Sequence, residues 1–188
     1  MINYLIKTFE ITEEEASLFS SCFQLKKYRK HEKFISFGQI SNKVGFVKSG
    51  IFKCELIGTN KRVVDDFVFE NQFVSNHYSF LTKQKSQKEI TCMDDSTIKV
   101  ISRDQLNLLA QQHSFIESMA RQVNEMLFLR THQKLTALKL QSAEERYLSL
   151  ISSNKTVIEK IPQYDIASYL NVSPETISRI RKKLSTRS

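Results

Sequence analysis

The stretch from Ser114 to Leu140 contains neither glycine nor proline, and this limits the possible folds more than any other feature of the sequence. Apolar residues recur along it at spacings of three and four, which indicates a helix beginning with a Ser114 to Glu117 capping box. At about 1.5 Å per residue, such a helix is about 40 Å long. Apolar residues lie on two of its sides, so one small domain cannot cover them all.

We therefore expect this helix to pair with its counterpart in a second copy of the chain, forming a two-fold dimer. A core helix within a monomer is the alternative. The residues expected at the dimer interface are Ile116, Met119, Val123, Met126 and Leu127.

The region from Lys33 to Ile101 has a different character, with short runs in which apolar and polar residues alternate. Phe52, Cys54 and Leu56 alternate with Lys53 and Glu55, and similar runs follow at 63–68, 88–92 and 97–101. All four glycines of the chain lie here, between positions 38 and 58. Period-two alternation broken by turn residues predicts antiparallel strands in a tightly turning β-roll or jelly roll.

Helical signals flank this region. Thr12 with Glu15 has capping-box spacing and predicts a helix over 13–23, and Ser102 with Gln105 predicts another short helix. Ser142 with Glu145 predicts a helix that ends near 152–154. Residues 156–161 are rich in β-branched side chains, and we expect them to be extended.

Residues 162–184 have the pattern of a helix-turn-helix. Ala167 is the small residue needed where two helices cross, and Asn171 stands where the turn requires a left-handed conformation. Ser173 is a helix cap, and Pro174 suits the first position of the second helix. The buried face is expected to comprise Ile166, Leu170, Val172, Ile177, Ile180 and Leu184.

The opposite face of the second helix has the chemistry of DNA recognition. Arg179 can donate two hydrogen bonds to guanine, and Glu175 can accept one from cytosine. A surface ion pair between these two side chains is the alternative reading. We group Pro174 with them as base contacts. The expected phosphate contacts are Ser173, Thr176, Ser178, Lys182 and Lys183.

Composition excludes several other classes. The net charge of +8 favours a polyanionic partner. Cys22, Cys54 and Cys92 are far apart, which argues against disulfides and metal clusters and for a reducing cytoplasm. The sequence contains no apolar run long enough to span a membrane and no signal peptide, so we expect a cytoplasmic protein with no membrane partner.

Several segments together resemble the Crp/Fnr regulators. They are Ser-Ala-Glu-Glu-Arg-Tyr at 142–147, Ile-Ala-Ser-Tyr-Leu at 166–170 and Val-Ser-Pro-Glu-Thr-Ile-Ser-Arg-Ile-Arg at 172–181, with a weaker likeness at Phe37-Gly38, Ser49-Gly50 and 71–74. The resemblance spans about residues 15–184. It implies an α+β chain in which an antiparallel β-roll, or double-stranded β-helix, of the cyclic-nucleotide-binding type occupies 1–112. A dimerisation helix at 113–140 and a winged helix-turn-helix DNA-binding domain at 141–188 follow, the wing coming from 155–161.

The sequence departs from the cyclic-AMP-binding members at both ligand segments. Their Gly-Glu-Leu and Arg-Ser/Thr-Ala segments fall here on Ser75-Asn76-His77 and Ser86-Gln87-Lys88, so the ribose carboxylate and the phosphate guanidinium are missing. We expect no cyclic AMP, no other cofactor and no metal. A remodelled effector pocket of unknown ligand is assigned to Ser75, Asn76, His77, Lys85 and Ser86.

The sequence therefore predicts a homodimeric regulator that binds double-stranded DNA, with RNA polymerase as a further partner. The alternatives are a regulator that needs no effector and a protein–protein adaptor with a degenerate sensor domain. An enzyme is disfavoured, because the four histidines are scattered and the sequence has no Gly-x-Ser-x-Gly, phosphate-loop or His-Glu-x-x-His motif.

Overall fold

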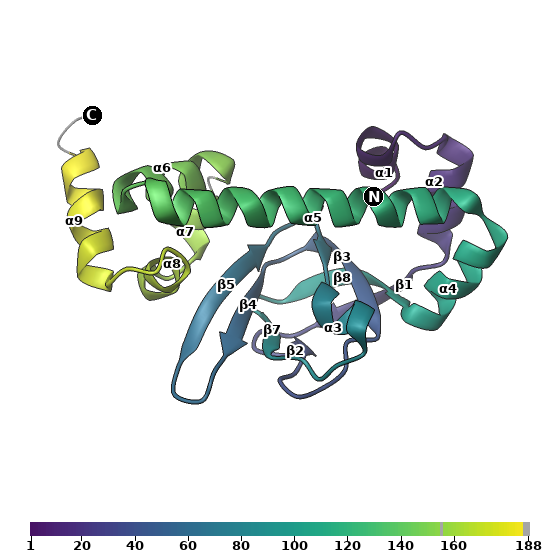
Figure 1. The fold of residues 1–188 in the computed structure, drawn as a ribbon, viewed down its shortest axis with the longest axis horizontal. Coiled ribbons are helices and arrows are strands. Elements are labelled where there is room, and N and C mark those ends of the chain that lie inside the picture. The colour runs from purple at the N-terminus through teal and green to yellow at the C-terminus, as the bar shows by residue number, and fades with distance from the viewer. Residues whose placement is uncertain (155, 186–188) are drawn as a thin grey trace. The chain divides into compact units, whose positions relative to one another are not determined.

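The computed structural model describes residues 1–154 and 156–185, which divide into two units (Figure 1). The first unit is Met1–Asn124 and the second is Glu125–Ser188. The boundary lies within α5 (Ser114–Leu140), which is the long helix that the sequence predicted. Its first helical residue is Ser114, so Ser114 does not precede the helix as the expected capping box requires.

Two four-stranded antiparallel sheets form the roll of the first unit. One has the order β1-β8-β3-β6 and the other β2-β7-β4-β5. The strands are β1 (Gln24–Tyr28), β2 (Lys33–Ile35), β3 (Lys43–Ser49), β4 (Phe52–Ile57), β5 (Arg62–Val68), β6 (Phe73–Val74), β7 (Lys88–Cys92) and β8 (Ser96–Ser102). The predicted antiparallel roll is confirmed.

The interior of the roll is apolar and closely packed. Phe34, Phe52 and Ile98 are almost fully buried in it. A side chain at Gly45 would collide with Ile98 and would place its Cβ 2.9 Å from Cγ1 of Val74, so the core would have to shift to accept it. Gly50 has a φ of 98° in the turn between β3 and β4, as a tight turn in a roll demands.

A second core lies between the roll and the helices of the same unit. These helices are α1 (Ile2–Phe9), α2 (Glu13–Ser21), α4 (Arg103–Gln112) and the beginning of α5. The capping boxes predicted at Thr12 and at Ser102 are both present. A short helix, α3 (His77–Thr82), follows β6.

This second core corrects part of the predicted dimer interface. Ile116 and Met119 are 6% and 5% exposed, because they pack against α1, α2 and α4 of their own chain. Val123 is half-buried against the same cluster. Ile116 and Met119 therefore stabilise the protomer and offer almost no surface to a second copy, whereas the assignment of Val123 to the interface stays a prediction.

The second unit consists of helices joined by short turns, with no strand among the residues that the structure describes. After α5 it contains α6 (Ala143–Ser153), α7 (Thr156–Lys160), α8 (Gln163–Tyr169) and α9 (Pro174–Ser185). The capping box of Ser142 with Glu145 is confirmed, as is the end of α6 at Asn154.

The strand predicted over 156–161 is wrong, because α7 occupies these positions. Val157 and Ile161, four residues apart, are both buried, so they share one side of a helical turn. The described residues of the predicted wing therefore form no strand. Lys155, where that wing was to begin, and residues 186–188 of the predicted DNA-binding domain lie outside the described residues.

Among the described residues, no helix combines the length and hydropathy needed to cross a membrane.

Candidate nucleic-acid interface

Helices α8 and α9 form a helix-turn-helix. In Figure 1 α8 is seen nearly along its axis whereas α9 runs across the view, so the two helices cross steeply. Ala167 is 1% exposed on α8, and its carbonyl accepts a hydrogen bond of 3.0 Å from the backbone N–H of Val172. Asn171 has a φ of 54°, which is the left-handed conformation predicted for the turn.

The beginning of α9 is fixed by two side chains. The Ser173 hydroxyl accepts a hydrogen bond of 3.3 Å from the backbone N–H of Thr176, so Ser173 caps the helix as predicted. Pro174 is the first helical residue. Its carbonyl accepts a 2.8 Å hydrogen bond from Nε2 of Gln163, which links the first residues of the two helices.

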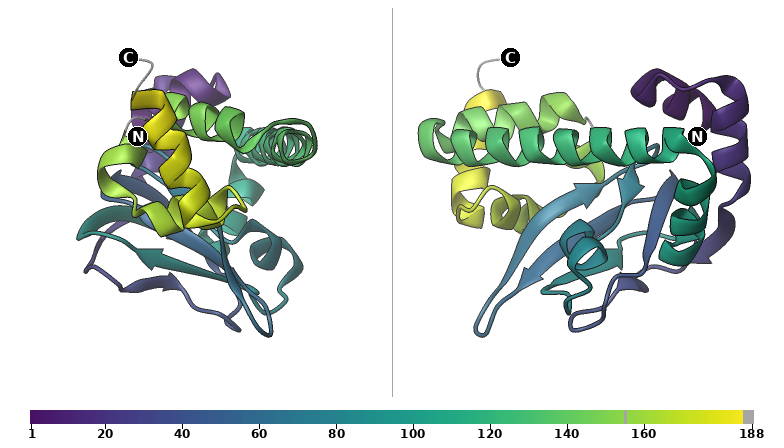
Figure 2. Two further views of the ribbon diagram at one scale, coloured as in Figure 1. Left: turned by 90° about the vertical axis from the view of Figure 1, so that its left-hand side faces the viewer. Right: turned by 45° about the vertical axis from the view of Figure 1, so that its right-hand side comes forward.

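Helix α9, yellow in Figure 2, has two sides that differ sharply in the exposure of their side chains. Ile177 and Ile180 are buried, and with Ile166 and Leu170 they form the apolar face that was predicted. Val172 and Leu184, predicted with them, are half-buried.

The polar side of α9 is open to solvent. At about 100° per residue, four of the side chains on this polar side fall within an arc of about 100° around the helix axis. These residues are Glu175, Ser178, Arg179 and Lys182, and all four are exposed.

The exposed side chains at the start of α9 interact with one another. Hydrogen bonding from Ser173, then from the helix backbone, and the charge of Arg179 hold the pKa of Glu175 below its ordinary value. Glu175 is therefore an ionised acceptor at neutral pH. Nη2 of Arg179 donates to the hydroxyl of Thr176 at 3.3 Å, which orients the guanidinium along the helix.

The predicted phosphate contacts do not share one environment. Ser173, Ser178 and Lys182 are exposed, whereas Thr176 is half-buried at the edge of the polar arc. Lys183 forms an ion pair with Glu144 of α6, with 2.5 Å between Nζ and Oε2. Part of its charge is therefore directed at its own protein.

Sequence reasoning missed two contacts that position the turn. Arg146 of α6 donates to the carbonyl of Leu170 at 3.1 Å, at the end of α8, and a second bond reaches the carbonyl of Gln141. Gln163 was also not singled out. Such contacts join residues far apart in the sequence and leave no periodic signal, although Arg146 lies within one of the segments that resemble Crp/Fnr regulators.

The residues assigned to an effector pocket are only partly brought together. Asn76 and Ser86 are buried, and Nδ2 of Asn76 donates to the hydroxyl of Ser86. Ser75 donates to the carbonyl of Lys43 at 3.2 Å, and Lys85 is exposed. His77 Nε2 lies 2.7 Å from Oδ1 of Asn124 on α5, which gives this histidine a partner within its own unit.

Among the described residues, no three His, Cys, Asp or Glu side chains gather in an arrangement that could hold a metal ion.

No protein-family model matches the sequence, and no curated protein matches it. Solved structures do match, and they identify the fold as that of the Crp/Fnr regulators. FixK2 from Bradyrhizobium japonicum has a TM-score of 0.73 at 16% identity, covering 88% of this chain and 85% of its own. A protein from Eubacterium rectale assigned to the Crp/Fnr family of transcriptional regulators has a TM-score of 0.69 at 13% identity, covering 98% and 88%.

A third similar structure is the global regulator CLP of Xanthomonas campestris, which is described as responsive to c-di-GMP. Its TM-score is 0.66 at 16% identity, covering 94% of this chain and 93% of its own. At such low identities the three likenesses establish the fold, in which a cyclic-nucleotide-binding-type roll and a long helix precede a helix-turn-helix.

Proposed function

We propose that this protein is a transcription regulator that binds a two-fold DNA site as a homodimer. The observation that carries the proposal is the exposed arc of α9, in which Glu175, Ser178, Arg179 and Lys182 project from a helix whose other side is buried. A recognition helix presents its N-terminal residues to base edges in the major groove. Arg179 and Glu175 stand in that half of α9 and have complementary base-reading chemistry.

The charge of the second unit supports the same partner. Residues 125–188 contain 11 Lys and Arg against 6 Asp and Glu. Lys182, on the exposed arc, and the hydroxyls of Ser173 and Ser178 are suited to phosphate oxygens on either side of the groove. Phosphate neutralisation then supplies affinity, and the base contacts supply specificity.

The proposed homodimer uses a different part of α5 from the one first predicted. Phe128, Leu135 and Leu138 are 70%, 51% and 47% exposed. At about 100° per residue, they fall with Thr131 within an arc of about 80° on one side of the helix. Their spacing of seven and three residues is that of a two-stranded helical interface. Of the residues first assigned, Met126 is 40% exposed and Leu127 is half-buried.

Two parallel α5 helices related by a two-fold axis would present two copies of α9. Half-sites about 34 Å apart, one turn of the duplex, are the expected spacing. Recruitment or blocking of RNA polymerase would follow from where such a site lies relative to a promoter.

The roll is proposed not to use cyclic AMP. Asn76 and Ser86 stand where the resemblance places the ribose carboxylate and the phosphate guanidinium, and the two side chains are hydrogen-bonded to each other. Loss of one charge-assisted contact costs about 1.5–3 kcal/mol, or more than tenfold in affinity.

Selection of bound fragments from randomised duplex DNA by the full chain tests the proposal. The expected product is an inverted repeat with half-site centres about one helical turn apart. Failure to enrich any sequence, with binding equal for all duplexes, would exclude a sequence-specific regulator and favour the adaptor.

A further inference from the structure

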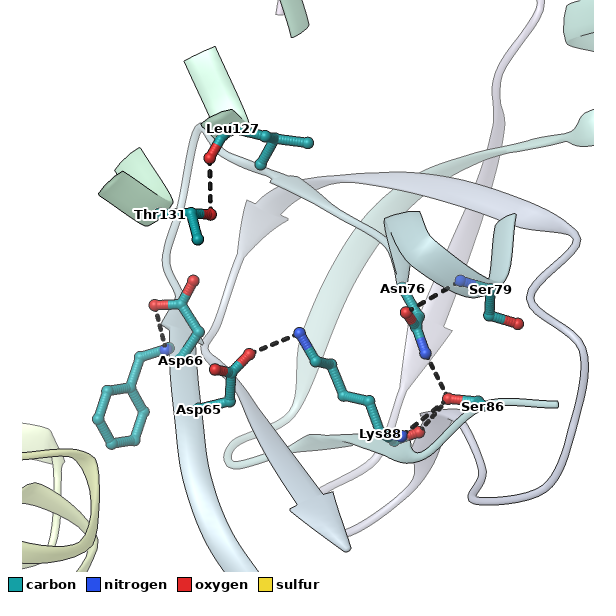
Figure 3. A network of polar contacts seen from close by, with 9 residues as sticks. Asp65, Asp66, Asn76, Ser79, Ser86, Lys88, Leu127 and Thr131 are labelled. Atoms are coloured by element: carbon teal, nitrogen blue, oxygen red, sulfur yellow. Dashed lines mark hydrogen bonds and ion pairs between the residues drawn. The ribbon is translucent and has the colours of Figure 1, made fainter. Parts of the chain in front are cut away.

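A lysine and an aspartate meet inside the roll. Nζ of Lys88 on β7 lies 2.5 Å from Oδ2 of Asp65 on β5, and both side chains are about one-quarter exposed, at 25% and 27%. Strand β4 lies between β7 and β5 in the sheet, so the pair spans β4 (Figure 3).

The register of β7 shows which face of the sheet carries Lys88. Ile90 and Cys92, two and four residues further along β7, are fully buried in the core of the roll. Since side chains alternate along a strand, Lys88 projects from the same interior face. Its ammonium also interacts with Cys54, another residue of this core.

A β-bulge turns Asp65 to the same face. Asp66 pairs with Cys54 and Val64 pairs with Glu55, so Asp65 is the extra residue between the two pairs. In a bulge of this kind two consecutive residues oppose one residue of the partner strand. Asp65 and Asp66 therefore both face the interior, on the side of Cys54.

Ser86 and Asn76, close to Lys88, are hydrogen-bonded to each other and to the backbone. The hydroxyl of Ser86 accepts from the backbone N–H of Lys88 at 3.0 Å and donates to its carbonyl at 2.5 Å. Asn76 donates to this hydroxyl and accepts from the backbone N–H of Ser79 at 3.3 Å. Figure 3 shows these side chains converging on one region of the roll.

The charges around Lys88 oppose an anionic ligand. Burial alone would lower the pKa of Lys88, but the Asp65 carboxylate, with smaller contributions from Cys54 and Asp66, raises it above its ordinary value. The ammonium of Lys88 is thus paired with Asp65 and is also attracted, more weakly, by Asp66. A further lysine, Lys43, lies over the ring of Phe34, a residue of the same core, with Nζ 4.6 Å from the ring centroid.

We propose that the ion pair of Lys88 with Asp65 takes the place of an anionic effector in this roll, so that the protein binds no cyclic nucleotide or other phosphate ligand there. The inference rests on the proposed function, because it says how this proposed regulator differs from regulators that need an effector. An incoming phosphate would have to displace Asp65 from Lys88 and lie beside Asp66. The DNA-binding form is consequently reached without such a ligand.

Thermal unfolding of the full chain tests the proposal directly. The probes are cyclic AMP, c-di-GMP and inorganic phosphate, each compared with sodium chloride at equal ionic strength. The expected result is no saturable rise in Tm beyond the chloride control. A saturable rise with any of the three would overturn the proposal, and this measurement needs no variant to fold.

A double-mutant cycle tests the pair itself. Asp65→Asn and Lys88→Met are each expected to lower Tm by roughly 4–8 °C, because each leaves one charge inside the roll without its partner. The double variant is expected to lose clearly less than the sum of the two. Additive losses would show that the two side chains do not act as a unit, and the proposal would fail.

The DNA selection described above separates this inference from the proposed function. Wild-type protein that binds its selected site with no ligand added supports both. Binding that appears only after one of the three probes is added overturns this inference and retains the function. Absence of specific binding in every condition removes the function, while the unfolding experiments still decide whether the roll excludes phosphate ligands.

Discussion

Replacing Arg179 with alanine separates base recognition from general attraction to DNA. Arg179 is exposed, and its guanidinium donates to the hydroxyl of Thr176 on the same helix, so its loss should cost the fold less than about 0.5 kcal/mol. A bidentate contact from arginine to guanine is worth roughly 1–3 kcal/mol of discrimination. The ratio of affinity for the selected site to affinity for a scrambled duplex should therefore fall by about 5- to 150-fold.

Fluorescence anisotropy with the two labelled duplexes, at several salt concentrations, measures this ratio. Lys182→Ala is the matched control, because Lys182 is exposed on the same arc of α9 and also carries one positive charge. Its removal should weaken binding to both duplexes alike and reduce the salt slope by about 1.

A loss of equal size on the selected and the scrambled duplexes after Arg179→Ala would refute the assignment of Arg179 as a base reader. Circular dichroism of both variants checks that the comparison is between folded proteins.

Three further predictions concern assembly, the turn and the roll. Leu135→Asp should weaken dimerisation by about 30-fold or more, whereas Gln133→Asp, on the opposite side of α5, should not. Analytical ultracentrifugation measures this, and an unchanged dimer in both variants would place the interface elsewhere. Asn171→Val should destabilise the protein by about 1–2 kcal/mol, because φ is 54° at this position, whereas Asn171→Gly should not. Equal denaturation midpoints for the two variants would contradict this prediction. Burial raises the pKa of Glu89, but hydrogen bonds from Lys33 and Arg62 outweigh it and hold this pKa below its ordinary value. The stabilisation by Glu89 is therefore present above its pKa in the unfolded chain, and it is lost as the pH falls through its pKa in the folded protein. Glu89→Gln should therefore cost about 1–2 kcal/mol at pH 7 and progressively less below about pH 4 in urea titrations, and a cost independent of pH would count against the ion pairs.

Local patterns predicted most of the fold correctly. Alternation located β4, β5, β7 and β8, and the capping boxes located the starts of α2, α4 and α6. Strands β1 and β6 were missed. Four of the five residues of β1 are exposed, and β6 has only two residues, so neither shows an alternating apolar pattern.

The errors arose where tertiary packing outweighs local preference. The β-branched side chains around Val157 and Ile158 favoured a strand, yet the burial of Val157 with Ile161 selects one turn of helix. The backbone N–H of Thr156 is capped by the side chain of Asn154 at 2.9 Å, which the sequence alone did not indicate.

The site was predicted unevenly for a similar reason. The polar face of α9 follows from helical periodicity, and the structure exposes it as expected. Periodicity also marked Ile116 and Met119 as apolar, but it cannot tell whether an apolar side chain meets its own protomer or a second one. The helices α1, α2 and α4 decide this, and they are distant in sequence.

The bulge in β5 suggests how readily such a roll could change its chemistry. Asp65 is inserted between two cross-strand pairs, Asp66 with Cys54 and Val64 with Glu55. The side chains of these two pairs already lie on opposite faces of the sheet. Removing this single residue would join the two pairs into an unbroken ladder and leave every neighbouring side chain on its present face. Lys88 would then lose the carboxylate of Asp65 and keep only the weaker interaction with Asp66. A one-codon deletion, without any substitution, would therefore leave the interior ammonium more accessible to a small anion.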